Sequence, residues 1–530
     1  MMQLTFINWL LAFTPVLVVL VLMLALRWGG SRAGVTAWVI TLLLGWLHFG
    51  ASPRLLAYSQ VKGILLTLDV LYIIWTALLL FQVAREAGAV DIIGNLLQNL
   101  TSDRTMQGLL LGWLFPSFLQ GFGGFGVPVA VSAPLLMGVG FSPIQAVIMA
   151  SLGHGWAVNF GSMATSYQSL LAVTNLPGEL LAPDAAILMG ISAYICGGLV
   201  AYIAGGWKGL RRTLFPVLAL ATTMAVVQYL LAVNGMWTVA ATGAAMVGLA
   251  FGVLFARLPA FRSGYPEDKP INHAVSQNAL PSTGKSKPLW LSLSAYVILV
   301  GLAFLLNLSE PIKEALSFAQ IRLSFPELTT SLGWVTPAEE GRKISLFSHP
   351  GAILLYTSLS SMLVYGLTGY YKKGAVGRIL RGVVNGAVGS SLGIAVMVGL
   401  SVVMSHTGMT NLLAEGLSRS FGKNIFPLVS PFIGALGAFI TGSNNNSNVL
   451  FGVLQQRTAE LLGLSVTAIL AAQTTGGSLG SVFAPAKVIV GCSTVGLSGK
   501  EGLVMRKMIL LGLLPIVVTA LAAGIYVGFR

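Results

Sequence analysis

Long apolar runs recur along the whole of this 530-residue chain, and they restrict its fold more than any other feature. Many of them reach the roughly 18 to 20 residues that an α-helix needs to cross a lipid bilayer. Charged residues make up only 9% of the chain, whereas a soluble protein carries about 25% because its surface faces water. The sequence therefore predicts an all-α polytopic membrane protein that lies in the lipid bilayer.

The apolar runs predict about 12 transmembrane helices. We expect them near residues 7–26, 34–50, 64–84, 143–165, 186–206, 214–232, 237–257, 290–308, 350–369, 382–404, 464–488 and 508–528. Two further regions, near 107–139 and 426–456, are apolar but interrupted in the middle. The first run has no basic residues before it and no clear cleavage site, so we expect a retained span and not a signal peptide.

Loop charge predicts the orientation of the chain. Residues 207–212, 258–288 and 370–381 are basic, and the positive-inside rule assigns such loops to the cytoplasm. This rule also accounts for the excess of 30 basic over 16 acidic residues, so no nucleic-acid partner is expected. The loop at 309–349 carries five glutamates and is expected outside. Counting spans from these loops puts both termini outside, in a multi-pass protein of the cell (inner) membrane.

The same count divides the chain into two transmembrane halves. We expect an N-terminal half at 1–257, a cytoplasmic linker at 258–288, and a C-terminal half at 289–530. The region 107–139 must then enter and leave on the cytoplasmic side, and 426–456 must enter and leave from outside. Both are interpreted as re-entrant hairpins of opposite orientation, with a broken full span as the alternative.

An internal repeat supports this division. The distance from Gly88 to Gly121 is 33 residues, and the distance from Gly408 to Gly442 is 34. Each break is followed about 30 residues later by a polar interruption, LGHGWAVNFGSM in the first half and AQTTGGSLGS in the second. Two halves of opposite orientation, each with a broken helix, are typical of secondary transporters.

The first break predicts a site for an anion. Unpaired backbone in hydrocarbon costs several kcal/mol per group, so such breaks persist mostly where they line a site. A helix that begins at a break presents free N–H groups and the positive end of its dipole, which favour a carboxylate. Glycine allows a substrate to approach the main chain closely. The substrate-binding candidates here are Gln120, Gly121, Gly123, Gly124, Phe125 and Gly126.

The second break adds polar side chains, which can donate hydrogen bonds to an anion or accept them from a substrate hydroxyl. The alternative is that they cap their own helix ends, as Asn and Ser readily do. The substrate-binding candidates from this half are Ser443, Asn444, Asn445, Asn446, Ser447, Asn448, Thr474 and Thr475.

Three ionisable residues lie within predicted spans, where a charge is expensive and therefore a functional candidate. Asp69, His154 and Lys487 are the candidates for ion coupling. The alternatives are a neutral hydrogen-bonded histidine in the core and a lysine that extends its ammonium group to the membrane surface. The sequence contains five histidines and two cysteines, without a metal-binding or catalytic motif, so we expect no enzyme activity, metal or cofactor.

Three segments resemble the lactate permease family. They read FLQGFGGFGVPVAVSAPLLMGVGF, FITGSNNNSNVLFGVLQ and AAQTTGGSLGSVFAPAKVIVGCSTVGLSGKEG, and the similarity covers most of the chain in order. The resemblance implies transport of lactate or glycolate, generally together with protons. Gln120 and Asn444 stand where the family has acidic residues, and Ser481 stands where better-known members have a lysine. If a missing carboxylate is the family's proton carrier, another group such as His154 or Asp69 must replace it.

The leading hypothesis is a proton-coupled importer of a small 2-hydroxy monocarboxylate that works by alternating access around the two broken elements. The alternative within transport is a carrier of another organic anion, a sulfonate or dicarboxylate, with sodium as coupling ion. A membrane-embedded enzyme and a channel are the other classes, and inverted broken repeats favour a carrier over both. The oligomeric state, the enantiomer and the stoichiometry are left open by the sequence.

Overall fold

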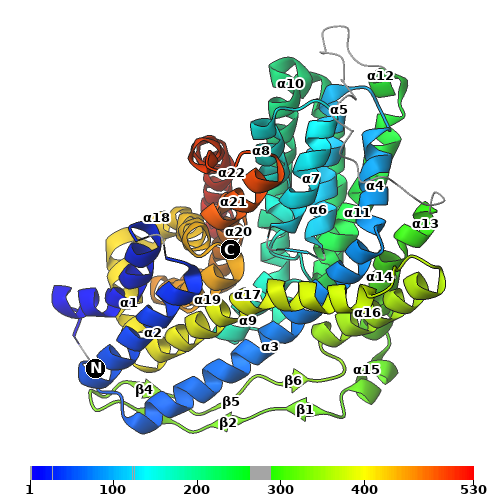
Figure 1. The fold of residues 1–530 in the computed structure, drawn as a ribbon. Helices are drawn as coiled ribbons and strands as arrows, with labels where there is room; N and C mark the ends of the chain where they lie inside the picture. The colour runs from blue at the N-terminus through cyan, green and yellow to red at the C-terminus, as the bar shows by residue number, and fades with distance from the viewer. Residues whose placement is uncertain (1–2, 27, 122, 125, 263–287, 530) are drawn as a thin grey trace.

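The computed structural model describes residues 3–26, 28–121, 123–124, 126–262 and 288–529, and it confirms the helical membrane fold (Figure 1). Within these residues, nine helices are long and apolar enough to cross a membrane. They are α1 (Phe6–Leu24), α2 (Gly30–Leu47), α3 (Pro53–Glu86), α10 (Gly178–Val233), α11 (Trp237–Ala256), α16 (Pro350–Leu367), α17 (Ala375–His406), α18 (Met409–Thr441) and α22 (Glu501–Gly528).

The count of about 12 spans is not confirmed, because several expected spans are parts of longer or broken elements. The spans expected at 186–206 and 214–232 both lie within α10, which is interrupted at Gly206 by a non-helical backbone (φ 61°, ψ −158°). The span expected at 143–165 is divided into shorter helices at its polar interruption. The polar segment expected to interrupt the span at 464–488 lies instead within one helix, Val466–Ser481, and that span is divided only after it, at residues 482–484. The span expected at 290–308 corresponds to a shorter helix, α14 (Ser294–Leu308).

The other helices are short and complete the two halves. In the first half they are α4 (Ala89–Gln98), α5 (Arg104–Leu109), the π-helix η1 (Leu110–Leu114), α6 (Phe115–Gln120), α7 (Val127–Gly138), α8 (Pro143–Gly153), the 3₁₀ turn η2 (Gly155–Ala157), α9 (Thr165–Thr174) and α12 (Pro259–Arg262). In the second half they are α13 (Leu289–Ser292), α15 (Glu310–Leu316), α19 (Asn444–Leu462), α20 (Val466–Ser481) and α21 (Pro485–Thr494). Residues 263–287 of the expected linker lie outside the described residues.

The order of elements repeats between the halves. A long helix, α3 or α17, ends just before a glycine with left-handed backbone, Gly88 (φ 71°) or Gly408 (φ 81°), and an amphipathic segment follows. Next come two antiparallel helical arms that contact each other, α6 with α7 and the end of α18 with α19 (Figure 1). In the first half α8 and α9 then flank the polar interruption, whereas in the second half it lies within α20 and α21 follows. Helix α10 or α22 completes the unit.

Glycines at equivalent positions allow the arms to pack closely against the helix that follows them. A β-carbon on Gly153 of α8 would overlap the backbone carbonyl of Gly112, and one on Gly476 of α20 would overlap the carbonyl of Pro431. Because backbone lies directly on backbone there, no larger residue fits. Each pair of arms and its following helix therefore form one closely packed unit.

A β-ribbon replaces the irregular loop that the sequence predicts at 309–349. Its strands are β1 (Gln320–Ile321), β2 (Ser324–Phe325), β3 (Leu328–Thr329), β4 (Val335–Thr336), β5 (Glu339–Glu340) and β6 (Ile344–Ser345). They pair antiparallel as β1–β6, β2–β5 and β3–β4. Figure 1 shows the ribbon along the lower edge of the molecule below α3, at the end opposite to α12.

Side chains fasten the ribbon to α3. Glu339 pairs with Lys62, and the Tyr72 hydroxyl donates to the carbonyl of Leu346 at 3.0 Å. Arg342 Nε lies 2.7 Å from Oδ2 of Asp69, which is buried on α3. These strands could not be predicted from the sequence, since each is only two residues long and has no run of alternating apolar residues.

Candidate functional site

The first break is enclosed by protein on several sides. It separates α6 from α7, and Gly126 adopts left-handed backbone (φ 91°) before the first turn of α7, which contains Pro128. A β-carbon on Gly121 would come within 2.6 Å of Thr242 Oγ1, and one on Gly123 within 3.1 Å of the Phe81 ring. These glycines are therefore required for close packing against α11 and α3. Phe125 lies outside the described residues.

The polar interruption after α8 packs against this break. The backbone N–H of Ser162 donates to the carbonyl of Gln120 at 2.8 Å, and a β-carbon on Gly124 would lie 3.0 Å from Ser162 Oγ. Ser162, Met163 and Ala164 all have left-handed backbone, with φ of 48°, 54° and 59°. Such conformations cost about 1 to 3 kcal/mol each in residues other than glycine and cluster at functional sites. No sequence signal marks these three residues, because glycine is the usual signal for left-handed backbone.

The second break begins α19 with a turn of asparagines. Asn444 Nδ2 donates to the carbonyl of Thr474 at 3.2 Å and to Ser478 Oγ at 2.9 Å. Asn448 Nδ2 donates to Thr474 Oγ1 at 2.8 Å. These bonds hold the start of α19 against the middle of α20, so side chains join the second break to the later polar segment of the same half.

Two further bonds join the halves of the chain. Ser166 Oγ, on α9, donates to Oδ1 of Asn445 at 2.6 Å, and Thr474 Oγ1 donates to Oδ1 of Asn159 at 2.6 Å. The interruption of the first half thus lies against both α19 and α20 of the second. We call the residues that meet here the amide cluster: Asn159, Ser166, Asn444, Asn445, Asn446, Asn448, Thr474 and Thr475. All of them are buried, with at most 7% of any residue exposed.

The amide cluster has an unusual number of polar atoms without a hydrogen-bond partner among the described residues. An unpaired buried polar group costs about 1 to 3 kcal/mol, so a group of them marks a place built for something other than packing. The unpaired donors are Asn159 Nδ2, Asn445 Nδ2 and Thr475 Oγ1. The unpaired acceptors are Oδ1 of Asn444, Asn446 and Asn448.

The two serines of the second break differ from the asparagines. Ser447 Oγ donates to the carbonyl of Gly434 at 2.7 Å and accepts from Gln473 Nε2 at 3.2 Å. Ser443 precedes α19, and its side chain does not bond the first turn of that helix. Ser447 therefore joins α18 to α19 and α20, and these two bonds do not cap its own helix.

The three ionisable candidates lie in different surroundings. His154 is 1% exposed at the end of α8, with Nδ1 bonded to the carbonyl of Ala150 at 2.7 Å. Lys487 is buried on α21 and donates to Ser481 Oγ at 3.0 Å. Ser481 in turn donates to the carbonyl of Ser478, whose hydroxyl accepts from Asn444, so a short chain of bonds leads from the ammonium group to the amide cluster. Among the residues that the structure describes, no similar chain of bonds leads there from Asp69, which pairs with Arg342 and His349 of the ribbon segment.

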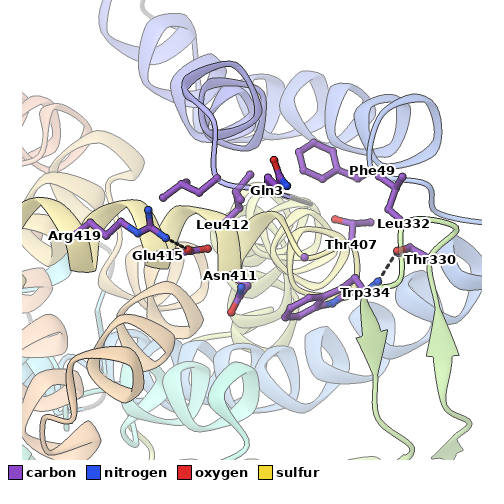
Figure 2. A pocket seen from close by; sticks show the side chains of 12 residues that line it. Gln3, Phe49, Thr330, Leu332, Trp334, Thr407, Asn411, Leu412, Glu415 and Arg419 are labelled. Carbon is purple, nitrogen blue, oxygen red and sulfur yellow. Dashed lines mark hydrogen bonds and ion pairs between the residues drawn. The ribbon is translucent and has the colours of Figure 1, made fainter. Parts of the chain in front are cut away.

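A cavity of about 520 Å³ lies away from the amide cluster, between the tip of the ribbon, the N-terminal segment and the start of α18 (Figure 2). Trp334, Thr407 and Asn411 line it. Its two charged side chains, Glu415 and Arg419, pair with each other at 2.6 Å. Since its only cation is already neutralised, this cavity offers less to a small anion than the amide cluster does. Within the described residues, no group of three or more His, Cys, Asp or Glu is placed to hold a metal ion.

Comparisons with known proteins cover nearly the whole chain. A family model described as L-lactate permease matches residues 8–529. The glycolate permease GlcA of Escherichia coli (strain K12) is 28% identical over 522 residues, covering 94% of this chain and 91% of that protein. The L-lactate permease of Bacillus subtilis (strain 168) is 26% identical over 507 residues, covering 91% and 89%. Among solved structures, the Alcanivorax borkumensis YdaH transporter aligns over 98% of both chains, with 16% identity and a TM-score of 0.49 that is too low to bear on function.

Proposed function

The chain belongs to the L-lactate permease family, a family of transporters and not of enzymes, and from this premise we propose that it imports lactate or glycolate by proton symport. The family match extends over both repeats and confirms the resemblance found in the sequence. The names of the relatives, glycolate permease and L-lactate permease, support a small 2-hydroxy monocarboxylate as substrate. A multi-pass protein with several apolar helices fits this activity, and we propose the bacterial inner membrane as its location.

The unpaired atoms of the amide cluster carry the proposal. A 2-hydroxy monocarboxylate has one carboxylate that accepts hydrogen bonds and one hydroxyl that donates one. We infer that Asn445 Nδ2 and Asn159 Nδ2 donate to the carboxylate, and that an amide oxygen of Asn446 or Asn448 accepts from the hydroxyl. The two classes of unpaired atoms thus match the two polar groups of the substrate.

Lys487 supplies the positive charge that the amides lack. Its ammonium group is linked to Asn444 through Ser481 and Ser478, and no carboxylate pairs with it among the described residues. A buried cation is retained at low cost only when an anion can approach it. In this proposal Lys487 attracts the substrate electrostatically, and the amides bind it.

The contacts within and between the halves support the proposal of alternating access. Within each half, glycines bring backbone onto backbone at Gly153 and Gly476, which favours movement of each unit as a whole. Between the halves, the amide cluster is joined by side-chain hydrogen bonds such as Ser166 to Asn445. We propose that the cluster opens along this boundary, first toward one side of the membrane and then toward the other.

Proton coupling is assigned to His154 in this proposal, since Gln120 and Asn444 cannot carry a proton at the positions where the family has acids. His154 lies at the start of the interruption that also contains Asn159. Asp69 is a weaker candidate, because Arg342 and His349 already surround its carboxylate.

Uptake of labelled lactate and glycolate into proteoliposomes, in sodium-free buffer, tests the function. We expect accumulation that rises when an inward proton gradient is imposed. Accumulation that requires sodium instead would support the alternative of a sodium-coupled carrier for another organic anion, such as a sulfonate or dicarboxylate. Absence of uptake of either acid under all gradients would refute the proposed substrate, and a screen of organic anions would follow.

A further inference from the structure

A second cavity of about 310 Å³ lies under the β-ribbon, apart from the amide cluster. Arg342, Lys343 and His349 of the ribbon segment line one side of it, and Asp69 of α3 lies beside them. Gln168 of α9 and Thr238 of α11 line the other side. None of these residues except Asp69 was singled out by the sequence, because the ribbon segment and the helices meet only in the folded chain.

The charges around this cavity favour an anion. Arg342 Nε pairs with Asp69 and its Nη2 donates to Gln168 Oε1 at 2.9 Å, so Asp69 neutralises one cation only. Lys343 is exposed and has no ion-pair partner among the described residues. His349 Nε2 lies 2.9 Å from Asp69, and its Nδ1 accepts from the backbone of Gly351. One positive charge is therefore left over even when His349 is neutral.

Helix ends add to this. Gly178 is the first residue of α10, Trp237 the first of α11 and Pro350 the first of α16, and all three line the cavity. The N-terminus of a helix carries roughly half a positive charge, and these three ends outnumber the two helix C-termini here, which precede the lining residues Leu176 and Gly235. In addition, Thr238 is only 5% exposed and its Oγ1 has no hydrogen-bond partner among the described residues. A buried hydroxyl without a partner, beside three helix N-termini and a free lysine, points to a ligand that accepts hydrogen bonds.

The cavity adjoins the helix that reaches the amide cluster. Gln168 follows Ser166 by two residues on α9, which is about 3 Å along the helix axis. Ser166 bonds Asn445, whereas Gln168 bonds Arg342. Helix α9 therefore contacts the ribbon cavity with one part of its surface and the amide cluster with another.

We propose that the ribbon cavity is a second, weaker carboxylate site, in which the substrate anion is held by Lys343, Arg342 and Thr238 before it enters the amide cluster. The ligand class rests on the proposed function, since the same small 2-hydroxy monocarboxylate occupies both sites. The size of the cavity suits such a molecule, and its excess positive charge concentrates anions near α9.

The first test measures whether glycolate protects Lys343 from acylation. The extent of acylation at each lysine of the purified full-length protein is measured by mass spectrometry. We expect glycolate to slow acylation of Lys343 about threefold, as suits an exposed charge whose interactions are worth at most about 1 kcal/mol. Chloride at the same ionic strength should protect much less. Lys373, also exposed, is the control and should react at the same rate throughout.

Two variants separate the ribbon cavity from the amide cluster. Protection of Lys343 should persist in Asn445→Leu and be lost in Thr238→Val. Three outcomes would each overturn the proposal. They are loss of protection in Asn445→Leu, equal protection by chloride, and a rate of Lys343 acylation that glycolate does not change. Because this assay does not require transport, protection without any uptake of lactate or glycolate would refute the proposed function and leave the second carboxylate site intact.

Transport kinetics provide the second test. Lys343→Gln should raise the KM for glycolate about threefold with little change in the maximal rate, because the residue concentrates substrate without entering the amide cluster. Lys373→Gln, the matched change of an exposed lysine, should leave KM unchanged. An unaltered KM in Lys343→Gln, or an equal rise in both variants, would contradict a role for the ribbon cavity in transport.

Discussion

Replacement of Asn445 by aspartate distinguishes anion binding from a purely structural role. The two side chains have the same shape. In the wild type Ser166 Oγ donates to Asn445 Oδ1 at 2.6 Å, and aspartate keeps an oxygen there to accept this bond. Only Nδ2, which has no partner among the described residues, changes from a donor into an anionic oxygen. A structural role therefore predicts that aspartate is tolerated better than leucine, which breaks the bond to Ser166.

The proposed role predicts the opposite order. Loss of a hydrogen bond to a charged group costs about 1.5 to 3 kcal/mol. Two like charges at about 4 Å repel by a further ~4 kcal/mol at an effective dielectric constant of about 20. The sum of about 6 kcal/mol corresponds to a loss of affinity of roughly ten-thousandfold for Asn445→Asp. Asn445→Leu removes the donor to the substrate without adding a charge, so its affinity for the substrate should fall by about ten- to a hundredfold.

The assay is initial uptake of labelled glycolate and lactate by proteoliposomes in mildly alkaline buffer, with the amount of reconstituted protein measured for each variant. Asn234→Asp is the matched control, since Asn234 is exposed at the end of α10 and bonds only the carbonyl of Leu230 among the described residues. Transport should decrease from the wild type to Asn445→Leu and further to Asn445→Asp. Uptake by the aspartate variant equal to or above that of the leucine variant would refute the assignment of Asn445 to the anion.

Three other predictions concern the frame and the coupling. Gly153→Ala should destabilise the purified protein by about 3 kcal/mol or more, because its methyl group would overlap the backbone of Gly112. The control Gly366→Ala, with open space around it, should leave the melting temperature in detergent nearly unchanged. Equal effects of the two substitutions would contradict the backbone contact at Gly153. Arg342→Gln should lower the free energy of unfolding by about 3 kcal/mol, because it leaves the buried Asp69 carboxylate with His349 as its one remaining partner among the described residues. Adding Asp69→Asn should recover part of this stability, and no recovery would argue against the Arg342–Asp69 pair. His154→Ala should abolish accumulation driven by a proton gradient and preserve exchange of labelled for unlabelled substrate, whereas an unchanged response to the gradient would exclude His154 from coupling.

The membrane fold and the repeat could be predicted because they depend on local signals. Apolar length identifies spans, and the spacing of Gly88 and Gly408 from the breaks survives with little sequence identity between the halves. The count of spans could not be predicted as well, because a kink such as Gly206 and the division of spans at polar interruptions depend on neighbouring helices. The ribbon was missed since its strands are stabilised by contacts with α3 and not by their own composition.

The candidate site was predicted in part for a similar reason. The run of asparagines at the second break marks a polar cluster by itself, and Asn444, Asn445, Asn446 and Asn448 do meet in the fold together with Thr474. Asn159 and Ser166 were not selected, although they lie in or just after an interruption that the sequence marks. Their contacts with Thr474 and Asn445 join residues more than 270 positions apart, and no local pattern records such a pairing.

The backbone contacts at Gly153 and Gly476 and the side-chain contacts of the amide cluster differ in how readily substitutions can change them. At Gly153 and Gly476 every substitution adds atoms where none fit, so the frame cannot change gradually. The amide cluster consists of exchangeable side chains on that fixed frame, and a single replacement can alter its charge or its hydrogen bonds without moving a helix. At Asn444, for example, an aspartate would add a charge to the cluster without moving a helix, so substrate preference in such a chain can change one side chain at a time.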